Sequence, residues 1–248
     1  MAKRLLSLVT ALLFITTPFV LAKDVPASKK VFAEKGNIYY CSSGKQKIQL
    51  TKGGKDRNPI LSPDGKKIAF IRKSNKMAYD PIDGAGNPRD PLADQLWLVD
   101  IDGKNEKILV QDINPDDKGY DKWKGEDVVG FIKDESVQFS PDGKTVYYLT
   151  PAWVTSSALR GINTNGTDGR FIVAANYLKV IDKGKHKGNL IIQQHRYFFT
   201  QGSYDWYYIY SPEGKELAVL ASTLDDVDWD SFYFEDTQQD NSANKSKN

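Results

Sequence analysis

Short apolar runs alternate with polar positions along much of the chain, and two of them repeat closely. Residues 58–73 read NPILSPDGKKIAFIRK, and residues 136–150 read SVQFSPDGKTVYYLT. In each segment an apolar run precedes Ser-Pro-Asp-Gly, and apolar residues at alternate positions follow it. Proline presets φ for a turn, aspartate can accept neighbouring backbone N–H groups, and glycine adopts the positive φ that closes a tight hairpin. Both segments are therefore predicted to be β-hairpins.

A second kind of hairpin alternates with the first. Residues 95–110 (QLWLVDIDGKNEKILV) and 205–221 (DWYYIYSPEGKELAVLA) each have an aromatic strand, a Gly-Lys turn and a second apolar strand. Residues 37–51 and 158–173 are looser copies, so four outer hairpins are expected. A third inner hairpin covers residues 177–199.

The fourth inner hairpin is missing as a continuous segment. Its halves can be supplied by WDSFYFE (229–235) and KKVFAEK (29–35), and their pairing would close a ring without exposed sheet edges. The predicted fold class is all-β: a small β-propeller of four four-stranded blades, closed by pairing of the N- and C-terminal strands. A five-bladed arrangement is the alternative.

These paired hairpins resemble the TolB-type propeller repeat, a relative of the WD-repeat blade. The match is close over residues 58–110 and 136–173, about 40% of the chain. The resemblance implies four-stranded blades around a central channel. TolB has an additional N-terminal domain and six blades, which the repeats here do not account for, so a role in the Tol system is not carried over. Propellers serve as binding modules, scaffolds and enzymes, so the resemblance names no chemistry.

The two ends of the chain differ from the repeats. Residues 1–22 have the features of a signal peptide: the basic Lys3 and Arg4, an apolar run, and small residues before a cleavage site after Ala22. An uncleaved membrane anchor is the alternative, but the apolar run is short and Pro18 follows it. Residues 23–236 form the predicted propeller domain, and the polar residues 237–248 a disordered tail. A periplasmic or secreted location is expected, with no membrane span after cleavage.

Composition narrows the partners. The chain has 248 residues with 34 Lys and Arg against 32 Asp and Glu, and the surplus lies in residues 1–22. A neutral mature chain has no electrostatic attraction for nucleic acid or an anionic membrane. Thirteen Tyr, eleven Phe and five Trp favour strands. The single cysteine, Cys41, is expected to be a small buried hydrophobe rather than a reactive thiol.

Long connections on one face are the most informative functional feature. The Ser-Pro-Asp-Gly and Gly-Lys turns are short and share one face, whereas the opposite face receives long connections, which on rigid scaffolds often carry function. They contain aromatic residues that can anchor a partner: Tyr79, Tyr120, Trp123, Trp153, Tyr204 and Trp229. Asp94 and Arg89 are predicted to supply orienting polar contacts. The structural alternative is that the aromatics plug the channel or pack over the blades.

The same connections are rich in acids: Asp80, Asp83, Asp90, Asp94, Asp112, Asp116, Asp117, Asp121, Asp225, Asp226, Asp228 and Asp230. A calcium site or a pair of glycan-hydrolysing carboxylates is conceivable, although solvated acids are the simpler interpretation and no calcium-loop spacing occurs. His186 and His195 are the only histidines, and no G-x-S-x-G motif occurs. The sequence therefore predicts a non-enzymatic module without metal or cofactor. This module is expected to recognise a protein partner in the cell envelope, and a glycan or a small ligand is the alternative.

Overall fold

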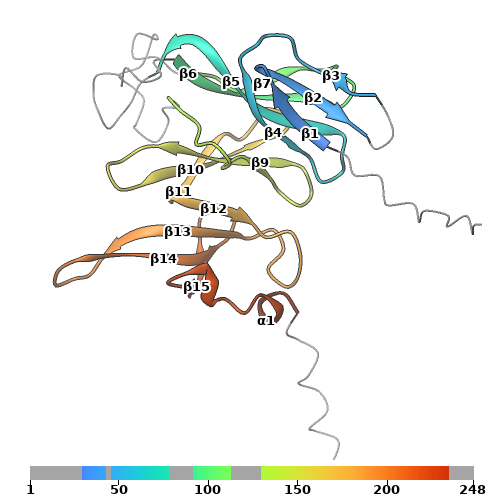
Figure 1. Cartoon of the computed structure of the whole chain (residues 1–248). Helices are drawn as coiled ribbons and strands as arrows, with labels where there is room; N and C mark the ends of the chain where they lie inside the picture. Colours follow the sequence, from blue (N-terminus) through green and yellow to red (C-terminus); the bar gives the residue numbers. More distant parts are fainter. Residues whose placement is uncertain (1–29, 43–45, 79–91, 113–129, 235–248) are drawn as a thin grey trace, which may run out of the picture.

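The computed structural model describes residues 30–42, 46–78, 92–112 and 130–234. Fifteen strands form four antiparallel sheets, the blades, which succeed one another along the chain in Figure 1. Blade 1 has three strands, β1 (Lys30–Glu34), β2 (Asn37–Cys41) and β3 (Ile48–Gln49). Blade 2 has four: β4 (Asp56–Leu61), β5 (Lys67–Met77), β6 (Leu92–Asp100) and β7 (Lys107–Val110).

The last two blades also have four strands each. Blade 3 consists of β8 (Gln138–Phe139), β9 (Thr145–Pro151), β10 (Ser157–Asn163) and β11 (Arg170–Ala174). Blade 4 consists of β12 (Tyr177–Val180), β13 (Leu190–Tyr197), β14 (Ser203–Tyr210) and β15 (Glu216–Ala221). A 3₁₀ turn, η3 (Leu224–Asp226), and a short helix, α1 (Trp229–Phe234), follow. The all-β, four-bladed prediction is confirmed, as are all seven predicted hairpins.

The repeated Ser-Pro-Asp-Gly turns close their hairpins by the same contacts. The Ser62 hydroxyl donates to Asp64 Oδ1 at 2.6 Å and accepts the Lys67 N–H at 2.9 Å. Ser140 makes the equivalent bonds to Asp142 and Thr145 at 2.6 and 2.9 Å. The turn glycines that follow have φ of 67° and 71°, as predicted. Because these bonds are local, the sequence motif alone determines the turn.

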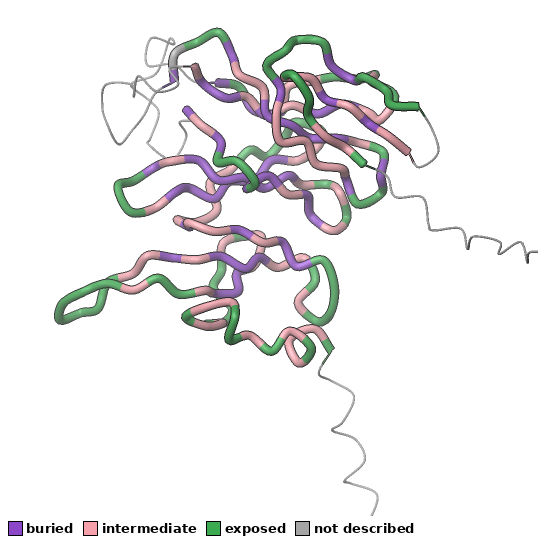
Figure 2. Tube along the Cα trace, in the orientation of Figure 1, coloured by how far each residue is buried: buried purple, intermediate pink, exposed green. Residues whose placement is uncertain are grey.

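The core consists of four apolar clusters, and their positions show how the blades stack. Three clusters lie between successive blades: blade 1 with 2, blade 2 with 3, and blade 3 with 4. Figure 2 shows the buried positions along the middles of the strands and the exposed ones at the turns. The fourth cluster lies between blade 4 and α1, where Ile181, Ile191 and Ile209 meet Phe232 and Tyr233. In the part of the chain that the structure describes, the stack therefore ends on a helix.

The predicted closing strand is wrong. Residues 229–234 are helical, and among the described strands β1 pairs with β2 alone and forms the edge of blade 1. The apolar side chains Trp229, Phe232 and Tyr233 have the i, i+3, i+4 spacing of one helix face. Asp228 begins the helix, because its carboxylate accepts the N–H groups of Asp230 and Ser231 at 3.1 and 3.2 Å. The helix packs its partly buried aromatics Trp229, Phe232 and Tyr233 against blade 4, where a closing strand would have continued the ring.

No helix among the described residues is long and apolar enough to cross a membrane. The predicted signal peptide (residues 1–22) and the predicted disordered tail (residues 237–248) lie outside the described residues. Cys41, expected to be buried, is only partly so. It faces the side of β2 opposite Tyr40, whose side chain packs toward blade 2.

Candidate functional site

The blade order places short and long connections on opposite faces. The β4–β5, β6–β7, β8–β9 and β10–β11 turns lie at one end of the strands, toward the right of Figure 1. The ends of β5, β7, β9 and β13 that lead toward the next strand lie on the opposite side, which we call the long-loop face. Of the predicted site residues, Tyr79, Arg89, Tyr120 and Trp123 lie outside the described residues.

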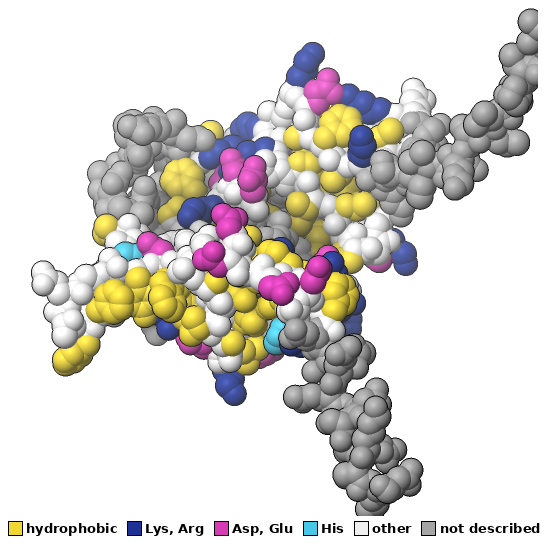
Figure 3. Space-filling model, turned by 60° about the horizontal axis from the view of Figure 1, so that its bottom comes forward, with side chains coloured by type: hydrophobic (Ala, Val, Ile, Leu, Met, Phe, Trp, Pro, Cys, Tyr) yellow, Lys and Arg dark blue, Asp and Glu magenta, His cyan; other side chains and the backbone are white. Residues whose placement is uncertain are grey.

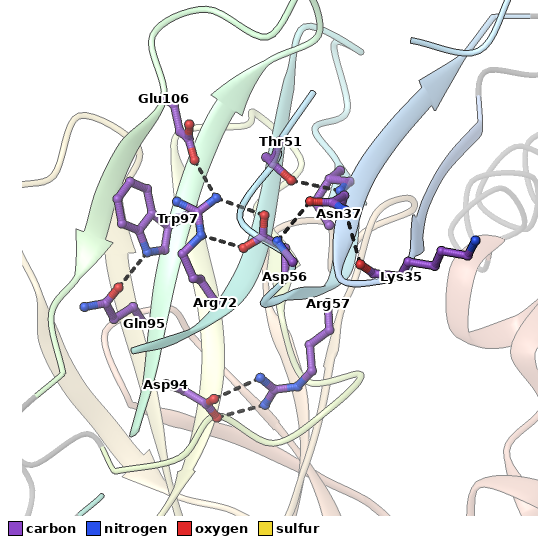
Figure 4. Close-up of polar contacts among 12 residues, drawn as sticks. Lys35, Asn37, Thr51, Asp56, Arg57, Arg72, Asp94, Gln95, Trp97 and Glu106 are labelled. Atoms are coloured by element: carbon purple, nitrogen blue, oxygen red, sulfur yellow. Dashed lines mark hydrogen bonds and ion pairs between the residues drawn. The ribbon is translucent and has the colours of Figure 1, made fainter. Parts of the chain in front are cut away.

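Asp94 lies in β6 with no exposed surface, inside a network of charges (Figure 4). Its oxygens accept two hydrogen bonds from the Arg57 guanidinium, at 2.9 and 2.8 Å, and the Ile132 N–H at 2.8 Å. Lys73 Nζ is 3.2 Å away, and Arg57 Nε also reaches Asp134 at 2.9 Å. Burial alone would lower the pKa of Arg57, but the bonds and charges of the two aspartates outweigh it and raise that pKa. The carboxylate thus joins blade 2 to the segment that leads to blade 3.

A second ionic cluster ties the strands of blade 2 together. Arg72 bonds Asp56 at 2.5 and 2.9 Å and Glu106 at 2.6 Å, and its guanidinium lies 4.3 Å from the Trp97 ring centre. The Trp97 indole N–H donates to Gln95 at 2.9 Å. These groups satisfy one another, as Figure 4 shows, so this cluster is a structural one.

Trp153 lies in the β9–β10 connection with 40% of its surface exposed, and the adjacent Val154 is 85% exposed. The connection is well ordered by hydrogen bonds: Trp153 N–H donates to Ser156 O at 2.9 Å, and Asn176 Nδ2 donates to Thr155 O at 2.7 Å. The indole packs edge-on against Phe171, with ring centres 5.9 Å apart. A shallow hollow of about 270 Å³ opens beside it, lined in part by Lys133 and Asn176. A large aromatic and an apolar side chain are thus presented beside a concave surface.

Tyr204 belongs to a larger aromatic group at the end of the β13–β14 hairpin. Its ring centre lies 4.6 Å from that of Phe198 and 5.5 Å from that of Trp206. The exposed fractions are 68% for Tyr197, 55% for Phe198 and 41% for Trp206, and Phe199 is fully exposed. Figure 3 shows hydrophobic side chains gathered along this protruding hairpin. We call residues 194–206 the hairpin tip.

The sequence does not reveal most of this group, because residues 177–199 and 205–221 have the pattern of ordinary blade hairpins. The register explains the exposure. β12 pairs with β13 only as far as Gln193, and β15 pairs with β14 only from Tyr207 onward. The remaining four residues of each central strand pair only with each other and project beyond the sheet as a two-stranded ribbon. The sequence signal for this projection is the length of the two central strands, which exceeds that of β12 and β15.

Trp229 has a different environment from the other predicted anchors. It is half-buried in α1, 5.5 and 5.8 Å from the ring centres of Phe232 and Tyr233, with Lys179 Nζ 4.3 Å above its ring. Within the described residues Trp229 packs the helix against blade 4. For this residue the structure agrees with the alternative that the aromatics pack over the blades.

A larger hollow, of about 630 Å³, lies along the inner strands β4, β8 and β12 at the short-turn end. Apolar side chains such as Ile60, Phe139 and Val180 line it, together with Lys187. At its side the Gln138 amide bridges two blades, donating to Leu178 O at 2.7 Å and accepting Val180 N–H at 2.8 Å. Within the described ranges, no three His, Cys, Asp or Glu side chains are grouped to hold a metal.

Comparison with known proteins shows the fold and no more. No family model and no curated protein matches the chain. Among solved structures, the tricorn protease superposes with a TM-score of 0.51 at 12% identity, over 77% of this chain and 15% of that one. The β-propeller domain of the Trilobed protease from Pyrococcus furiosus gives 0.43 at 15% identity, over 73% and 48%. A putative TolB from Agrobacterium tumefaciens gives 0.33 at 13% identity, over 78% and 77%.

The chain thus spans less than half of the two protease chains. The fold defines a β-propeller module, in agreement with the fold class predicted from the repeated hairpins.

Proposed function

We propose that this protein is a non-enzymatic binding module of the cell envelope that recognises a protein partner through its long-loop face. The observation that carries the proposal is the distribution of exposed apolar side chains. Among the described residues, ten large hydrophobic side chains are exposed, and six of them lie in or beside two connections of the long-loop face. These six are Trp153, Val154, Tyr197, Phe198, Phe199 and Trp206. Exposed aromatics on an ordered scaffold are characteristic of interface anchors.

Trp153 and Val154 are the central anchors of this proposal. The hydrogen bonds at both ends of their connection hold the backbone in place, so little conformational entropy is lost when a partner binds. The hollow beside the indole gives a partner side chain a concave surface to enter. Lys133 and Asn176 at its edge supply polar contacts around an apolar centre, the usual arrangement of an interface.

Two of the aspartates predicted to lie in connections are engaged structurally, which favours binding over catalysis. Asp94 is fully buried among cations, and Asp228 caps α1. Neither is therefore available as a nucleophile or general acid toward a glycan. A periplasmic or secreted location is part of the proposal and rests on residues 1–22. Fractionation with N-terminal sequencing of the recovered protein tests it, and a sequence that begins at Lys23 is the expected result.

The partner is tested by affinity capture from a cell-envelope extract, followed by reconstitution of each captured protein in purified form. A W153A/V154S variant should weaken the reconstituted complex at least tenfold, because it removes both anchors. The matched control is L217S/V219S, which changes two comparably exposed apolar side chains on β15, away from the long-loop face. Equal affinity of the W153A/V154S variant and the wild type would refute the assignment of this face.

A further inference from the structure

We propose that the hairpin tip inserts into a lipid surface, placing the Phe198 and Phe199 rings at the boundary between headgroups and acyl chains. This inference rests on the proposed function only for the compartment, and it concerns a different part of the long-loop face from Trp153. Insertion by apolar side chains is consistent with a nearly neutral mature chain, because it requires no attraction to anionic lipid.

The shape of the tip favours a lipid surface. A two-stranded ribbon four residues long extends past β12 and β15, and the turn at its end carries Phe199 fully exposed. The ribbon is ordered, because Phe198 N–H donates to Gly202 O at 3.0 Å and the Phe198 ring packs against Tyr204. An ordered convex projection reaches a surface before the rest of the molecule does. Figure 1 shows this hairpin extending beyond the neighbouring blades.

The charge distribution points to the same occupant. Residues 197–204 read YFFTQGSY and contain no ionisable acid or base other than the two tyrosine hydroxyls. The ionisable groups behind them contact each other: His195 Nδ1 lies 2.9 Å from Asp205 Oδ1, and Arg196 bonds Glu216. The Arg196 bonds to Glu216 also lower the pKa of that carboxyl, so it stays ionised and paired at neutral pH. A protein partner would ordinarily meet unpaired polar groups at the edge of its interface, and the tip offers few of them.

The order of side chains along the ribbon matches the polarity gradient of a membrane interface. Phe198 and Phe199 are at the end, Tyr197 and Tyr204 come next, and the His195–Asp205 pair and then Trp206 lie further back. Tyr and Trp prefer the headgroup region, where an apolar ring and a polar atom are both satisfied. Insertion as far as Tyr204 would leave the His195–Asp205 pair in water, and the Arg196 side chain extends away from the end of the hairpin toward Glu216 of β15.

The test is co-sedimentation of the purified protein with phosphatidylcholine vesicles, with and without 30% phosphatidylglycerol. Removal of two phenyl rings in an F198S/F199S variant should reduce partitioning by about 30-fold or more. The L217S/V219S variant controls for exposed apolar residues elsewhere, and any contribution of the N-terminal segment is the same in all variants. Added phosphatidylglycerol or 0.5 M salt should change wild-type binding less than about twofold, because residues 197–204 contain no Lys, Arg, His, Asp or Glu.

The depth of insertion gives a second measurement. In an F199W variant, tryptophan fluorescence should be quenched by brominated phosphatidylcholine well beyond the quenching of the wild type, because Trp206 lies behind the His195–Asp205 pair. Absence of vesicle binding, equal binding by F198S/F199S, or binding that requires anionic lipid would each overturn the proposal. If F198S/F199S instead loses the captured protein partner, the tip belongs to the protein interface. Failure of the W153A/V154S experiment alone refutes the proposed function and leaves the lipid site standing.

Discussion

Replacing Asp94 by alanine tests whether the buried charge network holds blades 2 and 3 together. In the folded protein Asp94 has no exposed surface and accepts three hydrogen bonds, two from Arg57 and one from the Ile132 N–H. The Lys73 ammonium is a third neighbour of the carboxylate, with its Nζ 3.2 Å from Asp94 Oδ1. Removal of the carboxylate leaves these groups without their acceptor in a region that water does not fill freely.

The magnitude follows from what remains after the change. Breaking a buried ion pair by removing one partner costs about 3–5 kcal/mol, and an orphaned buried N–H about 1–3 kcal/mol. Arg57 keeps its bond to Asp134 and its side chain is 28% exposed, which reduces the penalty. We therefore expect D94A to lose about 3–4 kcal/mol of unfolding free energy. D94N should lose less, because an amide oxygen can still accept the Ile132 N–H.

D134A is the matched control, because Asp134 bonds the same guanidinium but its side chain is 63% exposed. It should cost about 0–1 kcal/mol, as exposed ion pairs do. Urea unfolding at pH 7, followed by far-UV circular dichroism, gives the free energies by linear extrapolation. A D94A variant within 1 kcal/mol of wild type, or equal losses from D94A and D134A, would show that the network does not stabilise the fold.

Two further predictions concern the end of the blade stack and the turns. A Cβ on Gly184 would lie 2.5 Å from the Tyr233 carbonyl oxygen, so the G184A substitution should displace α1. It should lower the unfolding free energy by about 1–3 kcal/mol more than G166A, because Gly166 also has a positive φ but has open space at its Cβ position. Equal losses of unfolding free energy in urea would contradict this prediction. Hydrogen bonds from the turn serines and the N–H groups of Lys66 and Lys144 lower the pKa values of Asp64 and Asp142. Because these folded-state pKa values lie below the unfolded ones, the stabilisation is present above about pH 4 and is lost as the pH falls further. The unfolding free energy of the wild type should therefore drop more steeply between pH 5 and 2.5 than that of D64N/D142N, and parallel curves would contradict the assignment.

The sequence was informative about the hairpins because their determinants are local. A Ser-Pro-Asp-Gly turn makes its hydrogen bonds within five residues, and alternating apolar positions mark the two strands that it joins. Those signals do not depend on the rest of the chain, so the sequence alone predicts all seven hairpins. The site was less predictable. Tyr204 and Trp153 were found as connection aromatics, but Tyr197, Phe198, Phe199 and Trp206 resemble ordinary strand residues in sequence.

Tertiary structure decided three features that the pattern left open. Residues 229–234 could pair as a strand or form a helix, and packing of Trp229, Phe232 and Tyr233 on blade 4 selects the helix. In the sequence Asp94 resembles a solvent-exposed acid of a connection, yet the fold surrounds it with cations and removes it from solvent. The hairpin tip is exposed because neighbouring strands end before it does. Burial depends on what packs against a residue from other blades, so the chain specifies strands and turns locally, while exposure and partners are set only when the blades stack.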